Sequence, residues 1–364
     1  MRADSALQQI AGEKCGLEPV TLKYEINHRS NNMDKQEWGP DSLLKLSGSY
    51  WQTCTLHAGV KLDLFTAINN EELTAGELAL RLKADKRGLT MLLNALAAMN
   101  LLIKKEDKYA NTPAAVSFLS GDSSRYIGYI IKHHHYLVDG WSKLDQAVET
   151  GGPVRVNASE RGEDERESFL MGMYNMAMHL APQVAETCDL SGRQRLLDLG
   201  GGPGTYAIHF CLASPLLKAT VFDLPAAGPF ALKTIKKFNL ADRIDFMEGN
   251  YLEEELPGAY DAAWLSHIFH AESHENCIKI IRKTVSALKP GGMVMVHEFI
   301  LRNTMDGPLF PALFSLNMLL GTPDGRSYSE EEIMDMLADA GVKKIQRVPL
   351  ESPNDSGIIQ GIVD

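Results

Sequence analysis

The second half of the chain alternates short β-forming runs with helical segments. These runs are rich in branched and aromatic residues, and in chain order they read RLLDL (195–199), ATVFD (219–223), IDFME (244–248), YDAAWL (260–265), MVMVH (293–297), KKIQRV (343–348) and GIIQGIV (357–363). Strands that alternate with helices form a parallel sheet, because each helix returns the chain to the same edge. We therefore expect an α/β domain with a doubly wound sheet and helices on both faces.

Composition narrows the class of protein. The chain has 364 residues, 45% of them hydrophobic and 23% charged, which is typical of a globular chain with two domains. Its 36 basic and 47 acidic residues give a net charge of -11, which disfavours nucleic acid and anionic membranes as partners. The five cysteines are scattered, the first residues lack a signal-peptide core, and the longest apolar stretch is too short to cross a bilayer. A cytoplasmic protein is expected.

The first part of the chain predicts a small helical domain. Residues 1–40 lack periodicity and are interpreted as an N-terminal extension, in which Met33 is an alternative start. Apolar spacings of three and four predict a helix or helix pair over 41–65, and Thr74 with Glu77 forms a capping-box pattern before two helices and a hairpin. Helix, turn, helix and hairpin is the winged-helix order, but its second helix offers one arginine, Arg87, and otherwise mostly small or apolar side chains. That helix is expected to meet protein rather than DNA.

One long helix is predicted over residues 163–188, ahead of the α/β domain. It contains several methionines, among them Met173 and Met176. Methionine either fills a core or lines an adaptable substrate pocket, and both interpretations stay open here.

The run RLLDL leads directly into a glycine-rich loop. Asp198 is followed by Gly200, Gly202 and Gly204, while Thr205 stands where a dinucleotide fingerprint would have its third glycine. A carboxylate at Asp198, on the rim of the loop, would repel a pyrophosphate but favour a ligand with an ammonium and a sulfonium cation. This pattern points to S-adenosylmethionine as the cofactor.

Two further strand ends fit the same ligand. Asp223 and Leu224 follow the second strand, where a carboxylate can bind both ribose hydroxyls. Asn250 and Tyr251 follow the third strand, where the amide can bond the adenine and the ring can lie on its face. Because open α/β sheets bind ligands at the carboxyl ends of their strands, these residues are expected to converge.

From about residue 43 to residue 363 the chain resembles class I S-adenosylmethionine-dependent O-methyltransferases of the caffeate, acetylserotonin and hydroxyneurosporene type. The motifs that carry the resemblance are TAGELA, YANTPAA, LLDLGGGPG, VFDLP, LKPGG and YSEEEIMDMLADAG. The resemblance implies a Rossmann-like, mostly parallel seven-stranded sheet with a reversed last strand over 161–364, and a mostly α-helical winged-helix dimerisation domain over 41–160. It also implies a homodimer that methylates the hydroxyl of a small aromatic or apolar acceptor and releases S-adenosylhomocysteine.

The resemblance places the general base on His270 and its carboxylate partner on Glu298. An imidazole that titrates near neutrality can take the proton of a hydroxyl. Ser266 stands where the family often has a lysine beside the cofactor, and Ala271 and Ser327 replace family acids. These replacements leave open a paralogue with hydroxylase-like or decarboxylase-like chemistry, beside a winged-helix regulator that senses a ligand.

Candidate contacts to the acceptor are apolar, aromatic or amide side chains near the base or on flanking helices: Met173, Met176, Phe269, Phe314, Asn317 and Met318. Each of them is equally compatible with core packing.

His267, His270 and His274 allow an alternative interpretation as a metal site. Their spacing would suit a metal only if a helix began before His267. The segment is expected to be a strand end and a loop, and the spacing places no carboxylate partner beside it. The sequence therefore predicts no metal.

Overall fold

The computed structural model describes residues 38–155 and 162–364. The interpretation of residues 1–37 as an extension, the alternative start at Met33 and the predicted boundary at 160–161 lie outside these ranges. Contacts divide the chain into two units, residues 1–49 and 50–364. In the first unit, helix α2 (Pro40–Ser47) begins with a proline at its first turn and buries none of its residues.

The helical part of the second unit has the predicted element order. Helices α3 (Tyr50–Lys61), α4 (Leu64–Ile68), α5 (Ala75–Leu82), α6 (Lys86–Ala98) and α7 (Pro113–Phe118) surround a sheet of β1 (Leu73–Thr74), β3 (Lys108–Asn111) and β2 (Leu102–Lys105), in that order. The predicted capping box is confirmed, since the Thr74 hydroxyl accepts from the Glu77 N–H and the Glu77 carboxylate accepts from the Thr74 N–H. The predicted hairpin is β2 with β3. Leu78, Leu93 and Leu96 are fully buried in this core.

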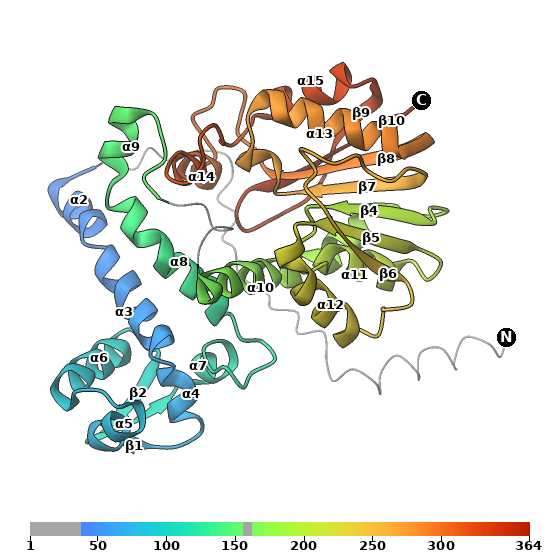
Figure 1. Cartoon of the computed structure of the whole chain (residues 1–364). Helices are drawn as coiled ribbons and strands as arrows, with labels where there is room; N and C mark the ends of the chain where they lie inside the picture. Colours follow the sequence, from blue (N-terminus) through green and yellow to red (C-terminus); the bar gives the residue numbers. More distant parts are fainter. Residues whose placement is uncertain (1–37, 156–161) are drawn as a thin grey trace. The chain divides into compact units, whose positions relative to one another are not determined.

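Three helices link this part to the large sheet. They are α8 (Gly128–Trp141), α9 (Leu144–Thr150) and α10 (Glu163–Thr187), and α10 confirms the predicted long helix. Helix α10 packs along α8 and α11 (Figure 1). Gly172 permits this approach to α8, because a Cβ there would lie 3.1 Å from the Ile130 Cα. Met173 and Met176 pack against the apolar core of the helical part, so the structure gives both methionines a core contact.

The large sheet has seven strands in the order β6-β5-β4-β7-β8-β10-β9. Their bounds are β4 (Arg195–Leu199), β5 (Lys218–Asp223), β6 (Ile244–Glu248), β7 (Tyr260–Ser266), β8 (Leu288–Phe299), β9 (Val342–Val348) and β10 (Ser356–Val363). Neighbouring strands from β6 to β8 run parallel, whereas β10 is antiparallel to both β8 and β9. The reversed last strand and the mostly parallel sheet are therefore confirmed.

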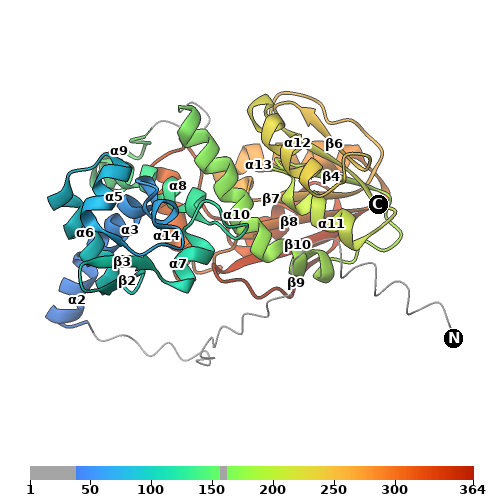
Figure 2. The ribbon, with the colours of Figure 1, turned by 90° about the horizontal axis from the view of Figure 1, so that it is seen from below.

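Helices cover both faces of this sheet (Figures 1 and 2). One face packs on α13 (His274–Ala287) and α15 (Glu330–Asp339), and the other packs on α10, α11 (Thr205–Ala213) and α12 (Gly228–Lys237). Helix α14 (Leu309–Leu319) lies after β8 and contacts both β8 and α9. None of the helices in the described ranges combines the length and the apolar character that a bilayer crossing requires.

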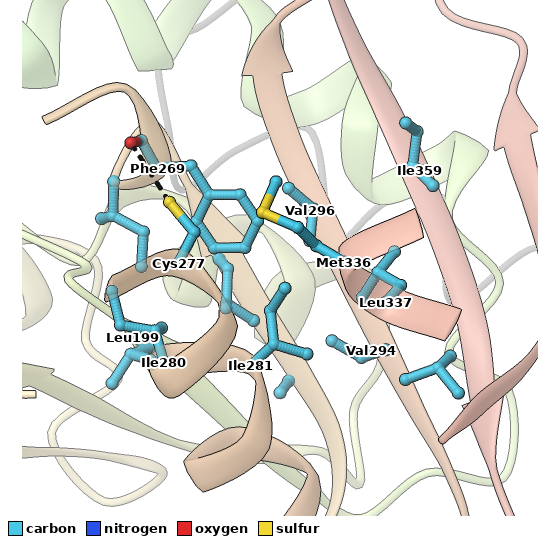
Figure 3. Packing of buried hydrophobic residues seen from close by; sticks show 14 of the residues in the cluster. Leu199, Phe269, Cys277, Ile280, Ile281, Val294, Val296, Met336, Leu337 and Ile359 are labelled. Carbon is cyan, nitrogen blue, oxygen red and sulfur yellow. Dashed lines mark hydrogen bonds between the residues drawn. The ribbon is translucent and has the colours of Figure 1, made fainter. Parts of the chain in front are cut away.

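The structure contradicts the acceptor-contact interpretation of Phe269 and favours the alternative, core packing. The side chain is fully buried in the core between the sheet and α13, near Leu199, Ile280 and Val296 (Figure 3). Phe269 opens the 3-10 turn η3 (Phe269–Ala271), where successive side chains point in different directions. Its backbone stays at the strand ends while its ring packs in the core.

Candidate functional site

The glycine-rich loop depends on backbone conformations that favour glycine. Gly200, Gly202 and Gly204 have φ values of 65, 52 and 74°, in the left-handed region. At Gly200 a Cβ would lie 2.5 Å from the Ile268 side chain, so the chain there has no room for one. At Gly202 a Cβ would meet nothing within 4 Å. The loop therefore turns tightly and leaves open space at Gly202, where a ligand can approach the backbone.

Asp198 lies beneath this loop rather than on its rim, which corrects the sequence prediction. The side chain is 1% exposed, and its Oδ2 accepts a hydrogen bond of 3.2 Å from the Ala207 N–H at the start of α11. Its Oδ1 has no hydrogen-bond partner among the described residues. Burial, with a contribution from the charge of Asp223, raises the pKa of Asp198 to about 7. A buried carboxylate with an unused oxygen is suited to a cationic group.

The end of β5 meets the loop as predicted. The carboxylate of Asp223 accepts from the Gly202 N–H at 2.7 Å and from the Leu224 N–H at 2.6 Å. Burial raises the pKa of Asp223, although these two hydrogen bonds oppose the rise. Gly202 and Asp223 thus lie together at the carboxyl edge of the sheet.

The end of β6 supplies Asn250 and Tyr251. The amide oxygen of Asn250 accepts from the Leu252 N–H at 3.0 Å, which shapes the turn after the strand. The hydroxyl of Tyr251 donates to Glu272 Oε1 at 3.1 Å, and a Cβ at Gly200 would lie 3.7 Å from the Tyr251 ring. Tyr251 therefore contacts both the glycine loop and the segment after His270.

These residues fit S-adenosylmethionine. The orphaned Oδ1 of Asp198 suits a cationic group, the space at Gly202 permits close approach of a ligand, and Asp223 offers a carboxylate at the neighbouring strand end. The same set suits a pyrophosphate poorly, because both side chains are acids.

His270 and Glu298 form a buried pair at the ends of β7 and β8. His270 Nδ1 lies 2.9 Å from Glu298 Oε2, and Glu298 is 2% exposed. The other oxygen, Oε1, accepts from the backbone N–H of Phe269 at 2.8 Å and of His270 at 3.3 Å. Burial opposes ionisation of this carboxyl, but the contact with His270 and the nearby imidazole of His267 outweigh it and hold the pKa of Glu298 well below its ordinary value. Glu298 is thus a fixed, ionised partner for the imidazole.

Aromatic rings surround this pair. The Phe314 ring of α14 lies 4.8 Å from the His270 ring at 80°, and Phe299 lies 4.6 Å from Phe314. Phe310 stacks on Phe314 one helical turn earlier, with ring centroids 5.9 Å apart. Phe314 is among the residues predicted from the sequence, whereas Phe299 and Phe310 are not. The sequence did offer a signal for each of them. Phe299 directly follows Glu298, and Phe310 lies four residues before Phe314, on the same face of a helix.

The remaining predicted residues are held by hydrogen bonds or by burial within the protein. Asn317 accepts hydrogen bonds of 2.7 and 3.0 Å from the Arg155 guanidinium, through its backbone and side-chain oxygens. Met318 is buried on the same helix. Ser266 Oγ lies 3.0 Å from His297 Nδ1, and His297 Nε2 lies 3.0 Å from Ser356 Oγ, so a buried histidine connects β7 to β10.

Ala271 and Ser327 stand where the resemblance places acids, so few carboxylates lie near His270. Glu272 accepts from Tyr251 and, at 2.9 Å, from the Asn276 amide, so its carboxylate is engaged with α13 and the β6 turn. The Ser327 hydroxyl donates to the Pro311 carbonyl at 2.9 Å and connects its loop to α14. Glu298 is therefore the acid that the structure pairs with His270.

His267 was grouped with His270 and His274 in the sequence analysis, and the structure changes that group. Helix α13 begins at His274 after the N-cap Ser273, so the three histidines do not share one helix face. His267 has a φ of 57°, and its Nδ1 lies 3.6 Å from Glu298 Oε2. The carboxylate partner that spacing could not place thus comes from the neighbouring strand β8.

Family comparison supports the class of protein that the fold and site define. A model of the O-methyltransferase domain matches residues 140–343, and a model of the O-methyltransferase dimerisation domain matches residues 44–121. The chain therefore belongs to the O-methyltransferase family with an N-terminal dimerisation domain, and it is an S-adenosylmethionine-dependent methyltransferase. The predicted family and cofactor are confirmed.

Individual relatives are bacterial and animal methyltransferases. The chain is 34% identical to a 3-hydroxy-5-methyl-1-naphthoate 3-O-methyltransferase of Streptomyces sahachiroi, over 89% of this chain and 95% of the relative. It is 31% identical to the tetracenomycin polyketide synthesis 8-O-methyltransferase TcmO of Streptomyces glaucescens, over 88% and 96%. Human N-acetylserotonin methyltransferase in complex with S-adenosylmethionine is a structural neighbour with a TM-score of 0.79 and 25% identity, over 91% and 99%.

Proposed function

We propose that this enzyme methylates a phenolic hydroxyl of a fused-ring, polyketide-like aromatic acceptor, with His270 as the general base. The observation that carries the proposal is the 2.9 Å contact between His270 Nδ1 and the buried Glu298 carboxylate. A proton held on Nδ1 by the carboxylate leaves Nε2 as the nitrogen that accepts a proton. The aromatic rings of Phe299, Phe310 and Phe314 support a flat, apolar acceptor beside it.

The chemistry requires little beyond a base and alignment. Bound S-adenosylmethionine supplies an electrophilic methyl group on a good leaving group. His270 removes the acceptor's hydroxyl proton as the oxygen attacks, and Glu298 stabilises the imidazolium that results. Proximity and orientation supply much of the remaining rate.

The cofactor site is proposed residue by residue. The open oxygen of Asp198 suits the ammonium of the cofactor, and Asp223 suits the ribose hydroxyls because each of its oxygens can accept a further hydrogen bond. Asn250 and Tyr251 would border the adenine, and the loop with Gly200, Gly202 and Gly204 would approach the ligand through its backbone. Leu224 and Ser266 would flank the ribose and the methionine part, respectively.

The relatives favour an aromatic hydroxyl as the acceptor group. The name of one specifies 3-O-methylation of a naphthoate, and the name of the other specifies 8-O-methyl transfer in tetracenomycin polyketide synthesis. Hydroxylase-like or decarboxylase-like chemistry, which the replaced acids left open, and a ligand-sensing regulator, which the winged-helix order left open, have no comparable support. A product that gains one methyl group distinguishes methyl transfer from them.

Turnover tests the proposal directly. Purified protein with S-adenosylmethionine and a panel of hydroxynaphthoates and polycyclic phenols should give methylated products by mass spectrometry. His270→Gln should lower the rate on the order of 10²-fold or more, whereas His274→Gln, at the start of α13, serves as the matched control. Full activity of His270→Gln would remove the assigned base.

We also propose that the protein is a homodimer through a winged-helix-type domain over residues 41–160, without nucleic-acid or membrane partners. The dimerisation-domain match supports self-association. Large apolar side chains are exposed on this part of the chain, including Tyr50, Trp51, Leu80 and Met91. A cytoplasmic location is proposed because Cys54, Cys188, Cys211 and Cys277, the cysteines in the described ranges, are free thiols.

A further inference from the structure

We propose that His267, His270 and Glu298 form a binding site for one Zn²⁺ ion, and that the bound ion switches off the base. The ion-binding half stands on geometry alone. The inhibitory half rests on the proposed function, since it assumes that His270 accepts the acceptor's proton.

The three side chains converge on one point. Each offers one ligand atom, and these atoms lie within 4.8 Å of one another. Zinc binds imidazole nitrogen and carboxylate oxygen at about 2.0–2.2 Å, which puts tetrahedral donors roughly 3.3–3.5 Å apart. Glu298 Oε2 lies 2.9 Å from His270 Nδ1 and 3.6 Å from His267 Nδ1, values that bracket this spacing. Two imidazoles and one carboxylate form an established zinc ligand set with an open fourth position.

The backbone holds these donors in place. Glu298 Oε1 is fixed by the Phe269 and His270 N–H groups, which leaves Oε2 directed at the two imidazoles. The backbone of His267 donates to the His297 carbonyl at 2.8 Å, directly after β7. A preorganised ligand set lowers the cost of ordering side chains around an ion.

The second observation is the unused nitrogen of His267. Its Nδ1 is buried and makes no hydrogen bond within the described ranges, because Glu298 Oε2, at 3.6 Å, lies just beyond hydrogen-bond distance. Buried polar atoms are nearly always satisfied, by protein, water or an ion. The proposed catalytic pair does not use this atom, and a metal ion would satisfy it.

Coordination has a defined chemical consequence for His270. When Nδ1 gives its lone pair to the ion, the ring proton resides on Nε2. That nitrogen then donates a hydrogen bond and no longer accepts a proton. No electron transfer or additional reactant is involved, so the effect reverses when the ion is removed.

The binding half is tested without any turnover. Untagged full-length protein is stripped with EDTA, dialysed against Zn²⁺ and measured by elemental analysis and calorimetry, with Co²⁺ absorption as a probe of coordination geometry. We expect one Zn²⁺ per chain in the wild type and in the control His274→Gln, and at least tenfold weaker binding in His267→Gln. Equal affinity of His267→Gln and the wild type, or no Zn²⁺ bound by the wild type, would overturn the site.

The inhibitory half is tested on the same samples. Zn²⁺ should abolish methyl transfer in proportion to occupancy, EDTA should restore it, and Mg²⁺ at the same concentration should have no effect because it prefers oxygen ligands. Full activity with the site occupied would refute the switching role while leaving the measured site intact. A preparation without turnover would contradict the proposed function, but its Zn²⁺ binding would still decide the first half.

Discussion

At the scale of single residues, Glu298 connects the end of β8 to the segment that follows β7. Its two oxygens accept from three backbone N–H groups, those of Phe269, His270 and Phe299, and contact the imidazole of His270. Reorientation of this carboxylate is energetically costly, because it would break several charge-assisted hydrogen bonds. The direction of the His270 ring is therefore set by a residue twenty-eight positions further along the chain.

The first prediction concerns this pair. Glu298→Gln should lower kcat on the order of 10²-fold, because an amide cannot stabilise the imidazolium that forms during proton transfer. Steady-state kinetics check the value, and Glu275→Gln on the first turn of α13 is the control. The double variant His270→Gln/Glu298→Gln should be scarcely slower than His270→Gln alone, since both residues act as one unit. Multiplicative losses would show that they act separately.

A second prediction concerns Asp198. Its pKa of about 7 means that part of the free protein carries a neutral carboxyl near neutrality. A cationic ligand favours the ionised form, so binding of S-adenosylmethionine should strengthen as pH rises from about 6 to 8, with release of a proton. Calorimetry in buffers of different ionisation heat measures that proton. Asp198→Asn should bind more weakly and lose this pH dependence, and an unchanged dependence would exclude Asp198 as its source.

The residue scale also shows where sequence reasoning ends. The proximity of His270 to Glu298 could be predicted, because the family resemblance names both positions. The placement of His267 next to Glu298 could not, since it requires β7 and β8 to be neighbours and a positive φ at His267. No local pattern encodes either condition.

At the scale of elements, two phenylalanines that the sequence offers as acceptor contacts take different positions, one in the turn η3 and one on helix α14. Phe269 is fully buried in the core, whereas Phe314 is half-buried beside His270. Phe269→Ala should cost about 3–5 kcal/mol of unfolding free energy, as a cavity in a packed core does. Phe314→Ala should cost less stability but raise the KM for an aromatic acceptor about tenfold, through the loss of ring contacts worth about 1 kcal/mol each. Thermal unfolding and steady-state kinetics of both variants test these expectations. A larger stability loss in Phe314→Ala and a higher KM in Phe269→Ala would contradict the positions assigned to the two rings.

Most elements could be predicted, because their periodicity is local. The runs RLLDL and IDFME coincide with β4 and β6, and the long helix predicted over 163–188 is α10 within one residue. The strand β8 starts at Leu288, five residues before the predicted run, because Leu288 pairs with Tyr260 of β7 despite the following Pro and Gly. Strand pairing of this kind is a tertiary effect that overrides local preference.

At the scale of the whole molecule, we predict that the protein forms a dimer in solution. Light scattering should give about twice the chain mass of 40.2 kDa. Trp51→Glu replaces an exposed ring of α3 with a charged side chain. It should raise the monomer fraction, because a charge that becomes buried on dimerisation weakens an apolar interface. Leu216→Glu, at an exposed leucine outside the dimerisation-domain match, is the matched control. Equal dimerisation of the two variants would place the interface elsewhere.

The fold class followed from the sequence at this scale, since alternating elements and the glycine loop permit few topologies. The meeting of the glycine loop, Asp223 and the β8 carboxylate at one edge followed from that topology. The buried position of Asp198 did not, because strand alternation shows which face a side chain takes but not how deeply a loop covers it.

Strand β10 lies between β8 and β9 although it follows both in the chain. Without β10, an open gap would separate β8 from β9, and each would present an unpaired edge where residues 356–363 now pair. Unpaired edges of this kind are templates for pairing with another chain. The sheet is therefore complete only when its last strand in the chain has been inserted between two strands that precede it.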